Sequence, residues 1–212
     1  MSRLMGSWKP ALVRLALLPA VAAALCVSGP AQAQFTKGYK FLEAVDKKEG
    51  AEVEEAISKP GSTIINSRDV TTGRGALHIV TERRDLTWLR YLVSKGANVN
   101  LRDDRGIAPL QLATSLGWIE GVEFLVSKDA KVDESDDTGE TPLISAVHRK
   151  NTAMVRALLK GGADPNRADN SGRTALDYAK LLDNNSQLVT LLTTQAKAKA
   201  QHGAQAVYGP SL

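Results

Sequence analysis

Apolar residues recur along the chain as pairs of short stripes, and each pair is followed by a polar turn. In residues 139–166 (GETPLISAVHRKNTAMVRALLKGGADPN) the first stripe is formed by Leu143, Ala146 and Val147, and the second by Val155, Leu158 and Leu159. Spacings of three and four residues predict two short helices, each apolar on one face. Helices of about ten residues are marginal in water by themselves. We therefore expect similar units to be stacked on both sides of this one.

Helix start and stop signals enclose both stripes. Thr141 suits the N-cap of the first helix and Pro142 its first position, where no amide donor is required. Gly161 and Gly162 follow the second helix, and glycine tolerates the left-handed conformation that ends many helices. The segments ADPN and ADNSG that come next consist of turn-forming residues. The unit is predicted to be a helix, a turn, a second helix and a projecting hairpin.

The same pattern returns every 33 residues. Gly73, Gly106, Gly139 and Gly172 keep this interval, and each is followed by a related slot: GALH, APLQ, TPLI or TALD. On the predicted second helices the interval is kept by Leu89, Val122, Val155 and Leu188. Self-similarity at a fixed period of about 20–50 residues is typical of solenoid proteins.

The period and its TPL, GADPN and DxxG elements resemble those of the ankyrin repeat family. The resemblance extends to FLEAVDKKEGAEVEEAISK at 41–59. It implies an all-α fold, an ankyrin-repeat solenoid of about five helix-turn-helix repeats with β-turn fingers. We expect the repeats at about 37–66, 67–100, 101–133, 134–166 and 167–196, in a domain of residues 34–199 that precedes a flexible C-terminal tail at 200–212. The two end repeats should have charged outer faces, as solubility requires.

The second repeat departs from the family pattern. Gly75-Ala76 replaces Thr-Pro, and Val70 stands where an Asp is common, so we expect a poorly capped and loosely held helix there. Only His78 occupies the family's histidine position, and the resemblance gives it a structural role in bonding neighbouring backbone. Gln111, Ile144 and Asp177 stand in the other three repeats. The sequence leaves open whether those repeats make the corresponding hydrogen bonds.

The first 33 residues have the pattern of a secretory signal peptide. Basic residues precede an apolar run from Leu15 to Val27, and AQA at 31–33 supplies small residues for cleavage after Ala33. An uncleaved anchor is the alternative, but the run is short for a span of about 20 residues. A cleavage site of this kind without a retention or anchor motif looks bacterial. We therefore expect a periplasmic or secreted protein with no stable membrane anchor.

Removing this leader changes the charge and the cysteine content. The whole chain has 27 Lys and Arg residues against 23 Asp and Glu residues, a net charge of +4. Three of the basic residues lie in the leader, which leaves 24 against 23, a balance that does not indicate nucleic acid as a partner. Cys26, the only cysteine, is also lost, so we expect no disulfide and no thiolate chemistry in the mature chain.

No pattern in the sequence indicates catalysis, a metal or another cofactor. An active site requires a convergent set of reactive groups. His78, His148 and His202 lie far apart, with no second histidine or cysteine at metal-ligand spacing. The acidic run DESDD at 133–137 lacks the glycine and the final glutamate of a calcium loop. We expect a non-enzymatic protein without cofactors, and a hydrolase is a distant alternative.

Two tryptophans raise the possibility of stacking on a ligand. Trp88 lies on a predicted second helix, and Trp118 lies in a turn between two helices. For both residues, packing against the repeat is the favoured interpretation.

The resemblance implies protein binding through the finger tips and the concave face of the first helices. The finger residues at the family's contact positions are Arg74, Arg102, Asp104, Arg105, Ile107, Asp137, Glu140 and Arg173. The first-helix residues at such positions are Glu82, Arg83, Ser115, Leu116, His148 and Arg149. We favour Ile107 and Leu116, apolar residues beside arginines, as the interface centre. The alternative is that these two residues cover each other and shield a repeat junction.

We expect a monomer that binds one protein in the periplasm, such as a neighbouring enzyme or a toxin that it neutralises as an immunity protein. The alternative is an accessory role in envelope stress, in which the array supports an enzyme such as one that removes peroxide.

Overall fold

The structure, a computed structural model, describes residues 30–59, 61–183 and 186–207. In these ranges the helices form five pairs, which confirms the predicted all-α repeat solenoid. The first helices of the pairs are α1 (Pro30–Lys47), α3 (Ala76–Glu82), α5 (Pro109–Ser115), α7 (Pro142–His148) and α9 (Ala175–Asp183). The second helices are α2 (Gly50–Ile57), α4 (Leu86–Ser94), α6 (Ile119–Val126), α8 (Thr152–Lys160) and α10 (Ser186–Val207).

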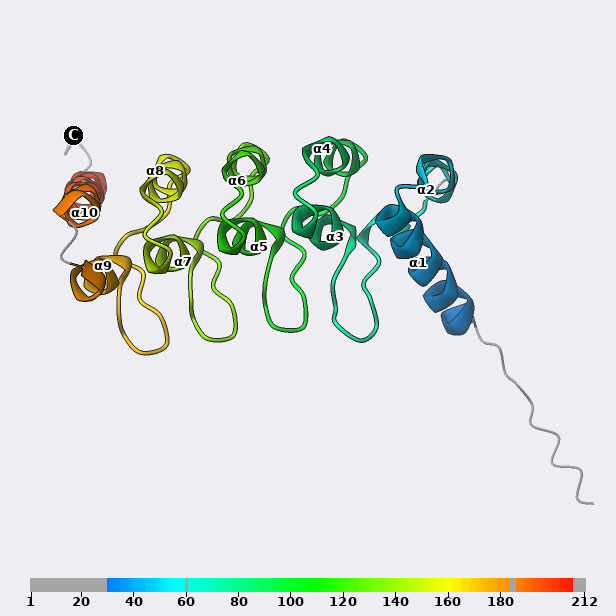
Figure 1. Cartoon of the computed structure of the whole chain (residues 1–212), viewed down its shortest axis with the longest axis horizontal. Coiled ribbons are helices and arrows are strands. Elements are labelled where there is room, and N and C mark those ends of the chain that lie inside the picture. The colour runs from blue at the N-terminus through cyan, green and yellow to red at the C-terminus, as the bar shows by residue number, and fades with distance from the viewer. Residues whose placement is uncertain (1–29, 60, 184–185, 208–212) are drawn as a thin grey trace, which may run out of the picture.

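The five pairs stand side by side along one axis (Figure 1). The first helices form an inner row and the second helices an outer row. Four loops project from the inner row, on the side away from the outer row, and these are the fingers. A short 3-10 helix, η1 (Ile64–Asn66), lies in the connection from α2 to α3. We call the side formed by the fingers and the inner row the concave face, and the side formed by the outer row the convex back, as in the family that the sequence resembles.

The apolar stripes of the second helices form a core that continues from repeat to repeat. Its fully buried members on the central second helices include Leu89, Leu92, Val122, Leu125, Val155 and Leu158. One helix pair could not bury such a stripe alone, so each repeat depends on its neighbours, as expected of a solenoid. This stacking explains why a unit such as residues 139–166 can be ordered within the chain.

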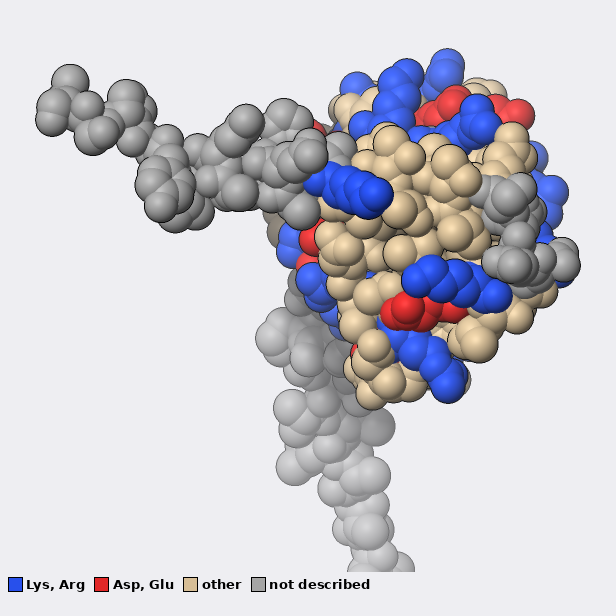
Figure 2. All heavy atoms as spheres, turned by 90° about the vertical axis from the view of Figure 1, so that its left-hand side faces the viewer, with Lys and Arg blue, Asp and Glu red and all other residues tan. Residues whose placement is uncertain are grey.

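The ends of the array differ from its middle. In the middle, His78 of the second repeat and Gln111 of the third each form a hydrogen bond to the repeat that follows. The corresponding residue of the fourth repeat, Ile144, is fully buried, whereas Asp177 and Lys180 of the last repeat give this side of α9 a charged surface. Figure 2 looks onto this end, where Lys, Arg, Asp and Glu side chains surround a central area of uncharged residues.

Both terminal helices extend beyond the predicted repeats. Helix α1 begins at Pro30, four residues before the expected mature N-terminus at Gln34, and residues 1–29 of the predicted leader lie outside the described residues. Helix α10 continues to Val207, so the segment expected as a tail from residue 200 is helical to that point. Residues 208–212 lie outside the described part.

As expected from Gly75-Ala76, the first helix of the second repeat has no side-chain cap at its N-terminal residue. The Gly75 N–H donates to His78 Nδ1 (3.1 Å), and the His78 N–H donates to the Gly75 carbonyl (3.0 Å). A Cβ atom at Gly75 would lie 2.5 Å from Leu101 Cδ2, so the missing side chain lets the next repeat pack closely. The imidazole thus accepts the Gly75 N–H, whereas in the fourth repeat the Thr141 hydroxyl accepts the Ile144 N–H (3.3 Å). Whether this helix is loosely held stays a prediction.

The finger of the second repeat, which we call the second finger, has its aspartate at position 69, one position earlier than the 33-residue period predicts. Asp69 precedes Gly73 by four positions, whereas Asp103 precedes Gly106 by three. In both fingers the aspartate carbonyl accepts the N–H of that glycine, at 2.9 and 3.0 Å. The second finger is therefore one residue longer, and the extra residue leaves Val70 74% exposed. The reading of Val70 as a lost aspartate was wrong.

Candidate functional site

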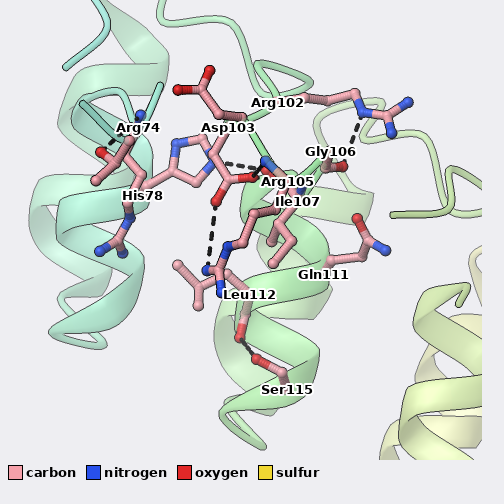
Figure 3. A network of polar contacts seen from close by, with 12 residues as sticks. Arg74, His78, Arg102, Asp103, Arg105, Gly106, Ile107, Gln111, Leu112 and Ser115 are labelled. Carbon is pink, nitrogen blue, oxygen red and sulfur yellow. Dashed lines mark hydrogen bonds and ion pairs between the residues drawn. The ribbon is translucent and has the colours of Figure 1, made fainter. Parts of the chain in front are cut away.

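Each finger is closed by one aspartate and one glycine. The glycines at 73, 106, 139 and 172 all have φ between 70° and 84°, a left-handed conformation that favours glycine. Asp103 Oδ1 accepts the N–H groups of Arg105 (2.9 Å) and Ile107 (2.8 Å), which folds the tip back on itself (Figure 3). The finger side chains are thus presented by a tightly hydrogen-bonded loop.

Hydrogen bonds to two of these carboxylates also affect their titration. Thr72 donates its hydroxyl to Asp69, and this bond, with those of the Thr71 and Thr72 amides, lowers the pKa of Asp69 below its usual value. The hydroxyls of Tyr178 and Ser171 likewise lower the pKa of Asp169. Both carboxylates are therefore ionised at neutral pH and remain acceptors for the finger.

Neighbouring fingers are hydrogen-bonded to one another through their backbones. The Asp104 N–H donates to the Thr72 carbonyl (3.0 Å), and the Asp137 N–H donates to the Arg105 carbonyl (3.2 Å). Between the last two fingers a side chain makes the connection, since Asn170 Nδ2 donates to the Asp137 carbonyl (3.2 Å). The fingers therefore form one connected surface rather than four independent loops.

His78 and Gln111 connect the inner helices to the fingers of the next repeats. His78 is fully buried, and burial lowers its pKa, so its ring is neutral. Because Nδ1 accepts the Gly75 N–H, Nε2 carries the proton and donates to the Ile107 carbonyl (2.9 Å). The structural role predicted for His78 is confirmed. Gln111 does the same one repeat later: Oε1 accepts the Ala108 N–H (3.3 Å), and Nε2 donates to the Glu140 carbonyl (2.8 Å).

Two of the predicted contact arginines hold the array together. Arg102 donates to the Gly106 carbonyl (2.9 Å), to Glu134 Oε2 (3.0 Å) and to the Ser135 carbonyl (2.8 Å). Arg83 donates to the carbonyl of Val45 (2.9 Å) and lies 3.6 Å from the Asp46 carboxylate, so it covers the C-terminal end of α1. These contacts give both arginines a structural function, whatever else they bind.

Several other predicted residues are paired within the protein. Arg74 Nη2 lies 2.9 Å from Glu82 Oε2, which joins a finger base to the end of α3. Asp104 accepts a hydrogen bond from Arg68 (2.8 Å) in the preceding repeat. The Arg68–Asp104 pair is exposed to solvent and the Arg74–Glu82 pair partly so, and pairs of this kind contribute little to stability. A partner could therefore replace them at small cost.

A second group of predicted residues meets in the fourth and fifth repeats. His148 Nδ1 lies 3.6 Å from Glu140 Oε1, and its ring packs edge-on against Tyr178, with the centroids 4.4 Å apart. The Arg173 guanidinium lies 5.9 Å from the centroid of the Tyr178 ring. Tyr178 is the member of this group that sequence reasoning missed. Its position follows Leu112 and Ser145 in the 33-residue register, which was the available signal.

The centre of the concave face lies between these two groups. It consists of Arg105, Ile107, Ser115 and Leu116, which come from the third finger and the end of α5 (three of them appear in Figure 3). The Arg105 side chain is 76% exposed and has only a distant pairing, 3.7 Å, with Asp103. Ile107 and Leu116 are each partly exposed. Asp137 and Arg149 are exposed nearby on the next repeat.

Three exposed apolar residues were also missed. They are Val70 at the tip of the longer finger, and Leu181 (68% exposed) and Leu182 (39%) at the end of α9. Leu181 and Leu182 follow His148 and Arg149 by one period, so the register could have identified them as contact positions. The signal for Val70 was the spacing of four between Asp69 and Gly73, where the other fingers have a spacing of three.

The tryptophans differ from each other. Trp118 is 6% exposed and packs over Gly121, where a Cβ atom would come within 2.2 Å of its ring. It is therefore a core residue. Trp88 is only partly buried, on the convex back.

The described ranges contain no cluster of three or more histidine, cysteine, aspartate and glutamate side chains suited to a metal ion. Within the same ranges, no helix combines the length and the apolarity needed to cross a bilayer.

A comparison with known protein families matches this architecture over most of the chain. A family model for ankyrin repeats, three copies long, matches residues 42–136 and again residues 130–203. The two matches together cover the region from α1 to α10.

Proposed function

Because the chain belongs to the ankyrin repeat family, whose repeats are non-enzymatic modules for protein–protein interaction, we propose that it binds a partner protein in the bacterial periplasm. The partner lies on the fingers and the ends of the inner helices. The observation that carries this proposal is that some residues of the concave face are bound within the array and others are left accessible. Arg83 and Arg102 hold the fold together, whereas Arg105, Ile107 and Leu116 are exposed or partly exposed at its centre.

The composition of this centre suits a protein interface. Apolar side chains beside an arginine are typical of the buried middle of such interfaces, and arginine is common among the residues that carry most of the binding energy. The hydrogen-bonded fingers are already ordered, so binding costs little conformational entropy. The Arg74–Glu82 ion pair and the Glu140–His148 contact on either side form a polar rim.

The proposal is tested by capturing the partner with the exported protein and identifying it by mass spectrometry. A variant with Ile107→Ser, Leu116→Ser and Arg105→Glu should lose that partner. Its helical content and thermal unfolding should stay close to those of the wild type, because these side chains are exposed or partly exposed. The matched control changes charges on exposed positions of the back, Glu120→Lys and Arg156→Glu, and should retain the partner. If only the control variant loses it, the partner binds the convex back and this assignment is wrong.

Export is a separate part of the proposal. The basic residues, the apolar run and the AQA site of the leader support cleavage after Ala33. Cleavage there leaves the greater part of α1 intact. We expect intact-mass measurement of the periplasmic protein to give a chain that starts at Gln34. A mass that includes Met1 would contradict export by this route.

A further inference from the structure

The convex back contains a pocket between the outer helices of the first two repeats. It encloses about 330 Å³ and is lined by Gly50 and Glu54 of α2 and by Thr87, Trp88 and Tyr91 of α4. A Cβ atom added at Gly50 would meet nothing within 4 Å, so the α2 side of the pocket is open. Helices α2 and α4 are neighbours in the outer row (Figure 1), on the opposite side of the array from the fingers.

Two aromatic rings form a corner of this pocket. The Trp88 and Tyr91 centroids are 5.7 Å apart, and the ring planes meet at 76°. Both side chains are partly exposed, so their surfaces remain accessible from solvent. The face of an aromatic ring carries partial negative charge and attracts cations, and tryptophan does so most strongly.

A carboxylate stands at the edge of the corner. Glu54 accepts hydrogen bonds from the Tyr91 hydroxyl and from Lys95 Nζ (2.8 Å). The Lys95 and Tyr91 hydrogen bonds lower the pKa of Glu54, whereas burial and the bond to Glu54 raise the pKa of Tyr91 to about 12. At neutral pH the glutamate is therefore charged and the phenol is neutral. Lys95 Nζ also lies 5.5 Å from the centroid of the Tyr91 ring, so this corner already holds one cation.

The surroundings of the pocket are acidic on the α2 side. Residues 49–57, EGAEVEEAI, contain four glutamates, of which Glu54 is paired with Lys95 and Glu55 with Lys59. Glu52, Glu54 and Glu55 are all exposed on α2. Charges arranged in this way raise the local concentration of cations and accelerate the approach of a basic partner.

We propose that this pocket is a second docking site, which receives an arginine side chain from a basic segment of a partner protein. The guanidinium stacks against Trp88 and lies beside the Glu54 carboxylate, while neighbouring basic residues of that segment face the acidic side of α2. Arginine fits better than lysine because the guanidinium is planar, more weakly hydrated and stacks on aromatic faces. This site does not depend on the concave face and goes beyond the function proposed above.

The test uses a small probe, N-acetyl-L-arginine N-methylamide, and its uncharged counterpart with citrulline in place of arginine. Binding to the exported protein is followed by NMR through the indole N–H signal of Trp88. The buried Trp118 serves as the internal reference, because its signal should not move. The arginine probe should give a saturable shift of the Trp88 signal, with an affinity at least about tenfold higher than that of the citrulline probe.

Variants separate a cation site from a general apolar pocket. Trp88→Leu should weaken arginine binding about tenfold, measured through the amide signals of α2 and α4. Lys95→Met should strengthen it severalfold, because it removes the cation that competes for Glu54 and Tyr91. Lys128→Met is the matched control, since Lys128 lies in the same way over the Phe124 ring (5.9 Å) but outside the pocket. This change should leave binding unaltered.

Equal binding of the arginine and citrulline probes would show an uncharged apolar pocket and overturn the proposal. So would the absence of a saturable Trp88 shift, or a Lys95→Met variant that binds the arginine probe less well. Because the probes do not involve the fingers, these outcomes are independent of whether the concave-face variant loses its partner.

Discussion

Neighbouring repeats are joined in two places, which differ in the interaction that they use. The stacked second helices form an outer layer, and the hydrogen bonds from the inner helices to the fingers form a finger layer. In the outer layer, each of the five repeats places a leucine or valine at the same position of its second helix: Val53, Leu89, Val122, Val155 and Leu188, all at most 2% exposed. In the finger layer, His78 and Gln111 make the same bridge with different groups, and Ile144 cannot make it. Burial of apolar surface is non-directional, so it requires the right volume at each position. A hydrogen bond requires only a donor at one point in space, which several side chains can supply.

The largest effect is expected in the outer layer. Leu158 is fully buried between repeats, so Leu158→Ala should lower the free energy of unfolding by about 2–5 kcal/mol through the cavity that it leaves. The control, Arg173→Ala on an exposed finger position, should change it by no more than about 0.5 kcal/mol. Urea denaturation measures both values. Equal midpoints for the two variants would show that the outer layer does not carry the stability.

An intermediate effect is expected where the finger layer uses a charged side chain. Arg102→Ala removes two hydrogen bonds that join the third and fourth repeats and one hydrogen bond within the third finger. The side chain is 41% exposed, so the cost should be about 1–2 kcal/mol, which is less than that of buried charged pairs. Arg102→Lys should recover only a minor share, because one ammonium cannot reach all three acceptors. Full recovery by lysine in the same urea titration would mean that charge, and not the planar donor group, joins these repeats.

The smallest effect on the free energy of unfolding is expected when the bridging histidine of the second repeat is replaced by the glutamine of the third. His78→Gln places in the second repeat the side chain that already works in the third, and at pH 7.5 it should cost less than about 1 kcal/mol. It should also remove a pH dependence. The folded-state pKa of His78 lies below the unfolded value of about 6.5, so the unfolded chain binds more protons between these two values.

Wild-type stability should therefore be complete above about pH 6.5 and should fall as the pH is lowered towards the folded-state pKa of His78. The glutamine variant should lack this fall. Urea titrations at several pH values between about 5 and 8 measure the difference. Parallel curves for the two proteins would show that burial of His78 is not what links this junction to pH.

The outer layer could be predicted from the sequence almost completely, and the finger layer only in outline. The buried second-helix positions follow from the 33-residue period and the apolar stripe, because burial depends on residue type and spacing alone. The bridging of Gln111 could not be predicted with the same confidence as that of His78. It depends on where an amide group points, and the residue type alone does not determine that.

The candidate site shows the same limit. The period identified Arg105, Ile107 and Leu116 as surface positions, and the structure leaves them exposed or partly exposed. It also selected Arg83 and Arg102, whose guanidinium groups donate hydrogen bonds to acceptors inside the array. Sequence patterns indicate which face a residue occupies, but the competition between internal and external partners is decided by distances of a few ångströms. Whether these positions bind a protein stays a prediction.

The longer second finger shows where this chain can accept additional length. The residue that lengthens the loop between Asp69 and Gly73 is taken up at the tip, and the two helices that follow, α3 and α4, pair as in the other repeats. Insertions are tolerated where the added backbone is exposed and breaks no buried hydrogen bonds. The chain next to Val70 is such a place, so a short epitope or a fluorophore-binding sequence could be built in there without disturbing the stack. A label at this position would lie at the rim of the concave face, and its signal would report the binding of a partner beside it.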